Sequence, residues 1–172
     1  MGADEQRKPV SFVEMNASVG SILFLWSSVE RELAKQIDAL DDGSKKNGAH
    51  TISQKIKRWV DLQSPASGER PEHGDLLREV RERLTRALEI RNQISHGLIG
   101  IRADRYEYNG EACLTTEFNG VKRTHPHAEL EHSMRVLSQL VWAIRSLSYA
   151  AMQKDPRKAE STYAGIRLNH MP

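Results

Sequence analysis

A helical repeat of apolar residues near the start of the chain is the feature that most constrains its fold. Between Met15 and Leu40 an apolar residue recurs every three or four positions: Met15, Val19, Ile22, Trp26, Val29, Leu33, Ile37 and Leu40. An α-helix turns once in about 3.6 residues, so this spacing places the apolar side chains on one face. It predicts a long amphipathic helix that needs partners for that face, and Asp41, Asp42 and Gly43 are expected to end it.

Three further stretches show the same spacing. A shorter helix is predicted around Ile52, Ile56, Trp59 and Val60, after a polar loop at 45–50. A third helix is predicted from Asp75, as N-cap, to Gly97, with Leu77, Val80, Leu84 and Leu88 on one face. The last is predicted from His127 to Asp155-Pro156, with Leu130, Met134, Leu137, Val141, Ile144, Ser148 and Ala151 on one face. Residues 64–74, rich in Pro and Gly, are expected to form a loop.

The segment 98–125 changes period from helical spacing to alternation. The alternating residues are Ile99, Ile101, Tyr106, Tyr108, Leu114, Thr116 and Phe118, with Asn109-Gly110 and Asn119-Gly120 as turn signals. This pattern predicts a small β-hairpin or a three-strand insertion between the last two helices.

Together these elements predict a mainly all-α, four-helix-bundle-like domain over residues 10–153, with the β insertion at 98–125. A mixed α+β domain with a larger sheet would need more strands than this segment supplies. Residues 154–172 are expected to form a polar C-terminal tail, loosely attached from residue 157 onward.

Composition excludes several classes of protein. The 172 residues carry a net charge of only +2, which does not favour nucleic-acid binding by bulk charge. A lone cysteine, Cys113, excludes an intrachain disulfide and a cysteine-based zinc site. The charged N-terminus does not resemble a signal peptide, and the longest apolar run, Ile22 to Trp26, is far short of a membrane span. We therefore expect a cytoplasmic protein with no membrane partner.

One residue of the third predicted helix breaks the apolar pattern. Arg91 falls about 20° from Leu84 on a helical projection, in the middle of the apolar stripe. A charge there needs a carboxylate, a phosphate or water, because burying an unpaired charge costs several kcal/mol. Asn92 adjoins Arg91, Ser95 lies one turn further along the same stripe, and His96 ends the helix beside Gly97.

Two explanations of Arg91 remain open on the residues alone. In the first, Arg91 pairs with an acid on another helix, for which Glu30 is a candidate, and His96 caps the helix C-terminus. In the second, Arg91 binds an anionic ligand beside the imidazole of His96. On an ideal helix the two residues lie about 140° apart, so their convergence within one subunit is expected to require a loosened helix end.

The stretch Arg91-Asn92-Gln93-Ile94-Ser95-His96 resembles the motif of the HEPN superfamily: an arginine, a polar residue, a few variable positions and a histidine near a helix end. Many members are metal-independent ribonucleases, often toxins or phage-defence proteins. Others bind nucleotides. The resemblance implies a homodimer in which two copies of this helix form a shared cleft, RNA or a nucleotide as ligand, an antitoxin protein as a further partner, and no cofactor.

The residue types suit cleavage of RNA without a metal ion. That reaction needs a base for the 2′-OH proton, an acid for the leaving oxygen and a cation for the phosphorane. An imidazole such as that of His96 can act as base or acid, and its symmetry copy could take the other role. Arg91 offers a planar fork for phosphate, with Ser95 as a second phosphate contact, and Asn92 would orient the phosphate or the histidine.

Other residue groups suggest weaker interpretations. His125, His127 and His132 have the composition of a metal cluster, but their spacing around Pro126 favours surface residues, and no metal site is predicted. Exposed positions of Phe24, Trp142 and Tyr149 on their helices favour a protein interface. Arginines at 78, 81, 83 and 86 alternate with acids, which indicates a salt-bridged solvated face rather than an RNA track.

Two functions follow. The first is a dimeric HEPN-like endoribonuclease using Arg91, His96 and Asn92. The second is a noncatalytic module that binds a nucleotide or a partner protein, favoured by the low net charge. A rise in melting temperature with nucleotide that Arg91→Ala removes, without RNA degradation by the wild type, would distinguish the second from the first.

Overall fold

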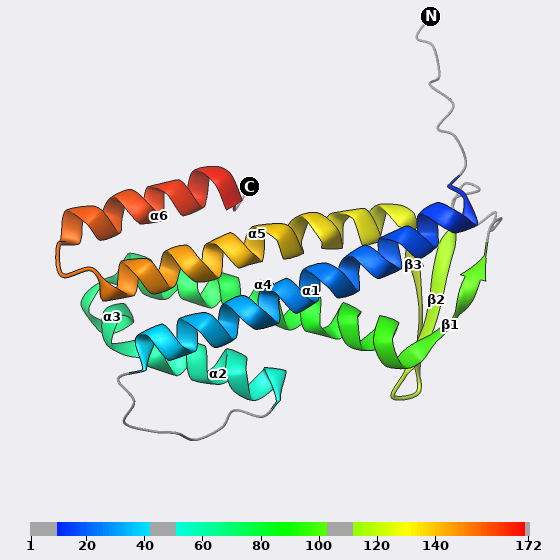
Figure 1. Ribbon diagram of the computed structural model, residues 1–172, viewed down its shortest axis with the longest axis horizontal. Coiled ribbons are helices and arrows are strands. Elements are labelled where there is room, and N and C mark those ends of the chain that lie inside the picture. The colour runs from blue at the N-terminus through cyan, green and yellow to red at the C-terminus, as the bar shows by residue number, and fades with distance from the viewer. Residues whose placement is uncertain (1–9, 42–50, 103–111, 171–172) are drawn as a thin grey trace, which may run out of the picture. The chain divides into compact units, whose positions relative to one another are not determined.

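The computed structural model describes residues 10–41, 51–102 and 112–170, with side chains to residue 167. Its elements, in chain order, are α1 (Phe12–Leu40), α2 (Ile52–Leu62), α3 (Ser64–Glu69), α4 (Pro71–Gly97), β1 (Leu98–Arg102), β2 (Cys113–Phe118), β3 (Val121–Pro126), α5 (His127–Met152) and α6 (Pro156–His170). Figure 1 shows these elements along the chain. The mainly-α fold with a small β insertion is confirmed.

Capping explains where the first two helices begin. Ser11 and Glu14 exchange hydrogen bonds at the start of α1, which begins three residues before the predicted apolar repeat. Thr51 and Gln54 form a full capping box before α2. Each pair satisfies backbone N–H groups that the first helical turn leaves without partners.

The described residues group into two compact units, each made of segments distant in sequence. Unit 1 contains residues up to Phe24 and Glu89–Met134, and therefore holds the sheet and the Arg91–His96 segment. Unit 2 contains Leu25–Leu88 and residues from Arg135 onward.

The sheet of unit 1 is antiparallel, in the order β1-β2-β3 (Figure 1). The β2–β3 hairpin turns at Asn119 and Gly120, with φ of 53° and 75°, as the Asn-Gly signal predicted. A register shift between Leu98 and Gly100 marks a bulge where β1 leaves α4. The other turn signal, Asn109-Gly110, and the strand residues Tyr106 and Tyr108 lie outside the described residues.

The predicted apolar faces form the cores. In unit 1, Met15, Ile22, Leu114 and Leu130 are fully buried. In unit 2 the buried residues include Trp26, Val29, Leu33, Trp59, Val80, Leu84, Leu137 and Ile144. Ser148, predicted on the apolar face of α5, is also fully buried, and its hydroxyl accepts a hydrogen bond from Trp59 Nε1 at 2.9 Å.

The predicted loop at 64–74 and the predicted start of the third helix at Asp75 are both wrong. Residues 64–69 form α3, with Pro65 in its first turn, and α4 begins at Pro71 rather than at Asp75. Proline is well tolerated in a first helical turn, where its missing N–H has no intrahelical partner anyway. The prolines therefore begin helices here instead of marking a loop.

The prediction of a loosely attached polar tail is also wrong. Residues 156–170 form α6, which runs back along α5 (Figure 1), and Ala159, Tyr163 and Ile166 on it are buried. Tyr163 Oη lies 3.2 Å from Nδ1 of the buried His73 on α4. Because of α6, the β insertion does not lie between the last two helices of the chain but between α4 and α5.

Among the described residues, α1 alone is long and apolar enough to cross a membrane. Core helices of soluble proteins share both properties. Met15, Ile22, Trp26, Val29 and Leu33 of α1 are buried within the molecule, and Glu32 forms an ion pair with Arg145 of α5. These features are compatible with a soluble protein.

Candidate functional site

The arginine that breaks the apolar pattern has polar neighbours on its own helix. Arg91 is half-buried near the end of α4. Its Nη1 donates to Asn92 Oδ1 at 3.1 Å and lies 3.3 Å from His96 Nε2. Its Nε is buried without a hydrogen-bond partner, and no carboxylate among the described residues of its unit pairs with it. Within the described part of unit 1, no acid neutralises the charge of this guanidinium.

The structure brings Arg91 and His96 together without loosening the helix. α4 stays helical to Gly97, yet the two side-chain tips are 3.3 Å apart. The expected requirement for a distorted helix end was wrong, because the long arginine side chain reaches across the angle that separates the two backbone positions.

The imidazole of His96 is exposed and rests on an aromatic ring. It stacks on Phe118 of β2 with ring centroids 6.0 Å apart and an interplanar angle of 29°. A guanidinium has only donors, so its contact with Nε2 is a hydrogen bond only when that nitrogen carries no proton. A hydrogen bond here requires the tautomer that carries its proton on Nδ1.

Close approach of β2 to the end of α4 positions this stack. A Cβ added at Gly97 would lie 2.5 Å from the backbone oxygen of Glu117 and 3.1 Å from Cβ of Phe118. Only glycine fits at that distance. The predicted helix stop at Gly97 is confirmed, and its physical reason is this contact between helix end and strand.

The two supporting residues lie on the same part of α4. Asn92 is half-buried and accepts the hydrogen bond from Arg91, which fixes the direction of the guanidinium. Ser95 is exposed one turn after Arg91, so the two share a helix face. Phosphate binding by Ser95 and Arg91 stays a prediction.

Glu30, the candidate acid for Arg91, belongs to unit 2. Its carboxylate accepts a hydrogen bond from Trp26 Nε1 at 2.5 Å, one turn earlier on α1. Glu30 therefore has a partner on its own helix, and its pairing with Arg91 stays a prediction.

The three predicted interface aromatics are exposed: Phe24 by 68%, Trp142 by 55% and Tyr149 by 50%. Trp142 and Tyr149 line a cavity of about 770 Å³ in unit 2, together with Ser161, Thr162, Gly165 and Ile166 of α6. Arg145, also on the cavity wall, makes a bidentate ion pair with Glu32, at 2.9 and 3.0 Å. These hydrogen bonds hold the pKa of Glu32 below its usual range.

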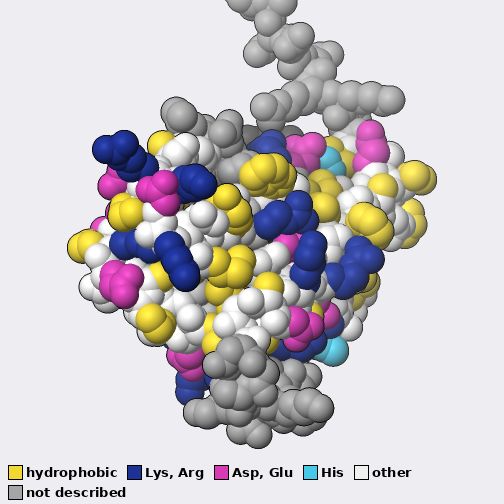
Figure 2. All heavy atoms as spheres, turned by 60° about the vertical axis from the view of Figure 1, so that its left-hand side comes forward, with side chains coloured by type: hydrophobic (Ala, Val, Ile, Leu, Met, Phe, Trp, Pro, Cys, Tyr) yellow, Lys and Arg dark blue, Asp and Glu magenta, His cyan; other side chains and the backbone are white. Residues whose placement is uncertain are grey.

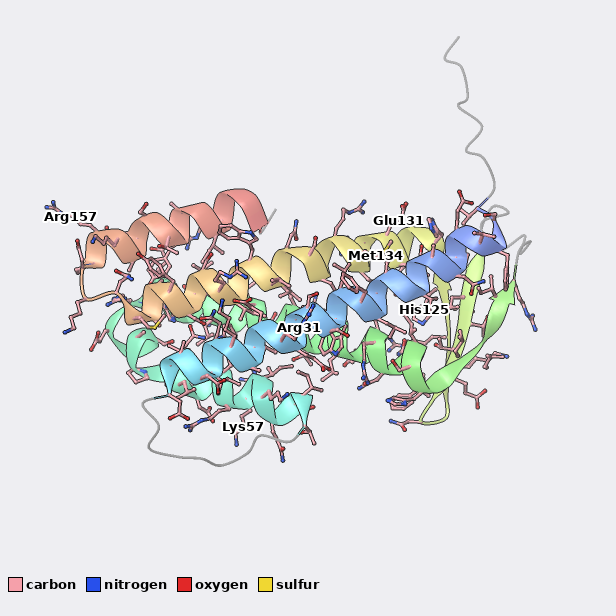
Figure 3. The ribbon with its side chains drawn as sticks, in the orientation of Figure 1. Arg31, Lys57, His125, Glu131, Met134 and Arg157 are labelled. Atoms are coloured by element: carbon pink, nitrogen blue, oxygen red, sulfur yellow. The ribbon has the colours of Figure 1, made fainter. Side chains whose placement is uncertain are left out.

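The histidines at the start of α5 are not a surface group. His125 is buried at the sheet (Figure 3), with Nε2 3.1 Å from Thr116 Oγ1 and Nδ1 3.3 Å from Glu129 Oε1. His127 Nε2 lies 3.1 Å from Ser18 Oγ, and only His132 is exposed. The surface interpretation was wrong for His125, because β3 directs it into the core. In the part of the chain that the structure describes, no three His, Cys, Asp or Glu side chains could share a metal ion.

Two arginines of the run on α4 form salt bridges, one of them with an acid of the predicted alternating pattern. Arg83 pairs with Glu79 at 2.8 Å, and Arg78 pairs with Asp75 at 2.7 Å. Figure 2 shows basic side chains beside acidic and hydrophobic ones on the face in view.

Sequence reasoning missed two partners. Phe118 was expected only as a strand residue, although its place just before the Asn119-Gly120 turn puts it at the hairpin end. The buried pair of His73 and Tyr163 in unit 2 was missed entirely, and burial, with a smaller effect of Arg70, lowers the pKa of His73 to about 4.

Comparison with protein-family models, curated proteins and solved structures found no match for this chain, so its assignment rests on the residues and geometry described above.

Proposed function

We propose that this chain is a HEPN-like, metal-independent endoribonuclease that acts as a homodimer, with Arg91 and His96 as catalytic residues and Asn92 in support. One observation carries the proposal: a guanidinium that no acid pairs with among the described residues of its unit lies 3.3 Å from an exposed imidazole. An anion that binds Arg91 would therefore also lie beside a proton donor or acceptor. The phosphodiester of RNA is such an anion.

The chemistry is an internal transesterification. The 2′-oxygen attacks phosphorus, the bond from phosphorus to the 5′-oxygen breaks, and a 2′,3′-cyclic phosphate and a 5′-hydroxyl result. A base takes the 2′-OH proton, and an acid gives a proton to the leaving 5′-oxygen. An imidazole acts as the base through a ring nitrogen that carries no proton. In a two-fold dimer, the partner subunit's copy of this histidine supplies the acid.

Arg91 stabilises the reacting phosphate. Its fork can donate two hydrogen bonds to phosphate oxygens, and these strengthen as charge builds up on the phosphorane. Asn92 holds one nitrogen of that fork, which preserves its orientation before RNA binds. Ser95, on the same helix face, can donate to a further phosphate oxygen.

The exposed apolar residues favour a partner protein. Besides Phe24, unit 1 exposes Phe12, Val13, Leu98 and Ile99. Exposed apolar side chains of this kind are typical of interfaces. We assign those of unit 1 to contacts with the second copy of the chain, and the exposed Trp142 and Tyr149 of unit 2 to the same copy or to an antitoxin. A cytoplasmic toxin or phage-defence role fits these assignments.

The test is cleavage of end-labelled RNA in EDTA by the wild type and two variants. His96→Ala and Arg91→Gln should each lower the cleavage rate at least about 100-fold, as loss of a proton-transfer group or of transition-state charge stabilisation does. His132→Ala is the matched control, because His132 is an exposed histidine of the same unit. Its rate should equal that of the wild type.

Cleavage that persists in His96→Ala at the wild-type rate would overturn the proposal. An inactive wild type whose melting temperature rises with a nucleotide, but not in Arg91→Ala, would instead support the noncatalytic nucleotide-binding function.

A further inference from the structure

We infer that the β2–β3 hairpin binds single-stranded RNA beside the Arg91–His96 site, with Phe118 contributing to base stacking and Arg123 contacting a backbone phosphate. This inference rests on the proposed function and names the form of RNA that the same site takes.

The register places Phe118 and Arg123 on one face of the sheet. Phe118 pairs with Val121, and Thr116 pairs with Arg123. Directly paired residues of antiparallel strands share a face, as do residues two apart on one strand. Phe118 and Arg123 are therefore diagonal neighbours on the face on which His96 stacks.

The stack of His96 and Phe118 is a platform for a nucleobase. His96 is exposed and Phe118 is half-exposed, while Val121 beside Phe118 is 53% exposed. A base that continues such a ring stack tightens binding about 5- to 150-fold whatever its identity. Since the stack includes the candidate catalytic imidazole, a base held there brings its own phosphate to Arg91.

Charge distinguishes the two faces of the hairpin. On the face of Phe118, Arg123 lies opposite the uncharged Thr116, and no acid pairs with Arg91 among the residues of unit 1 that the structure describes. On the other face, Lys122 lies opposite Glu117, so opposite charges meet. The face of Phe118 thus carries a positive charge that no cross-strand acid opposes in the described hairpin, and this charge complements a phosphate backbone.

Single-stranded RNA fits this surface better than a duplex. Paired bases are stacked within their helix and cannot offer a free ring face to Phe118, whereas an unpaired strand can. The net charge of +2 gives little general attraction for a duplex, so local contacts must supply the affinity.

The experiment measures binding separately from cleavage. A fluorescent 12-nucleotide RNA with 2′-O-methyl riboses lacks the attacking hydroxyl, so the intact wild-type protein can bind it without cutting it. Fluorescence anisotropy gives the Kd at several salt concentrations. Arg123→Gln should weaken binding several-fold and reduce the salt slope by about one. Phe118→Leu should weaken it about 5- to 150-fold.

Lys122→Gln is the matched control, because Lys122 neighbours Arg123 and faces the other side of the sheet. It should leave both the Kd and the salt slope close to those of the wild type. A duplex of the same sequence should bind more weakly than the single strand. Circular dichroism shows whether Phe118→Leu folds. If Phe118→Leu does not fold, Arg123→Gln still tests the inference, because Arg123 is exposed.

Equal effects of Arg123→Gln and Lys122→Gln, or a duplex that binds as tightly as the single strand, would overturn the inference. So would the absence of binding. These outcomes are separate from failure of the proposed function: binding that depends on Phe118 and Arg123 in a protein that never cleaves RNA would support the hairpin surface and contradict the ribonuclease.

Discussion

Gly97→Ala is the sharpest structural perturbation of the candidate site. The added Cβ would lie 2.5 Å from the Glu117 oxygen, so the strand or the helix end must shift by at least about 0.5 Å to reach the shortest contact that real Cβ atoms make. Both contacting atoms of Glu117 belong to the backbone and cannot rotate away. The shift would move Phe118, and with it the ring that supports His96.

The expected loss of stability combines two opposing effects. Overpacking of this kind costs about 1–3 kcal/mol. Replacing glycine by alanine at a helical position stabilises the helix by up to about 1 kcal/mol. With a middle value of about 2 kcal/mol for the overpacking, the net loss is about 1–2 kcal/mol, which lowers Tm by about 2–8 °C in a chain of this size. Cleavage should fall about tenfold or more, because a misplaced imidazole no longer meets the phosphate correctly.

Thermal unfolding, monitored by circular dichroism, measures the loss of stability. The RNA cleavage assay measures the loss of activity. Gly100→Ala is the matched control, since a Cβ at Gly100 of β1 meets nothing within 4 Å. Its Tm and its cleavage rate should remain near those of the wild type. If Gly97→Ala is as stable and as active as Gly100→Ala, the reasoning that β2 positions the site is refuted.

Two further predictions concern unit 2. The pKa of His73 is lowered to about 4 from 6.5, so between these pH values the unfolded chain binds a proton that the native chain excludes. The free energy of unfolding therefore decreases by up to about 3 kcal/mol as the pH falls through this window. His73→Phe should flatten the pH dependence of urea unfolding, and an unchanged slope would contradict this. Arg145→Met should cost about 2 kcal/mol by leaving the 7% exposed Glu32 without its partner. The double variant Arg145→Met/Glu32→Gln should recover part of this loss of unfolding free energy, because it removes the unpaired carboxylate. If urea unfolding shows no recovery, the unpaired charge of Glu32 is not the cause of the loss.

The elements with strong periodicity could be predicted from the sequence. The apolar face of α1 is buried at Met15, Ile22 and Leu33, and the Asn119-Gly120 turn lies where its residues require it. These features are local: each depends on residues a few positions apart. The apolar periodicity of α6 is too weak to predict the helix. Its buried face includes Ala159, Tyr163 and Ile166, which lie among mostly polar residues.

The candidate site could be predicted only in part. Arg91 was found because a charge interrupts an apolar stripe, and the motif pointed to His96. The stack of His96 on Phe118 joins residues 22 positions apart and depends on the close approach at Gly97. The contact between Arg91 and His96 depends on a side-chain conformation, which the angle between two helix positions does not determine. Such contacts depend on how side chains pack in the folded chain, which residue spacing alone does not determine.

The proposed function requires that Arg91 and His96 cleave RNA by internal transesterification. Mass spectrometry of RNA incubated in EDTA with the wild type identifies the new 3′ ends, and the same measurement on His96→Ala shows whether they depend on the imidazole. The account predicts 2′,3′-cyclic phosphates with the wild type and intact RNA with the variant. Equal amounts of the same ends from both proteins would contradict it.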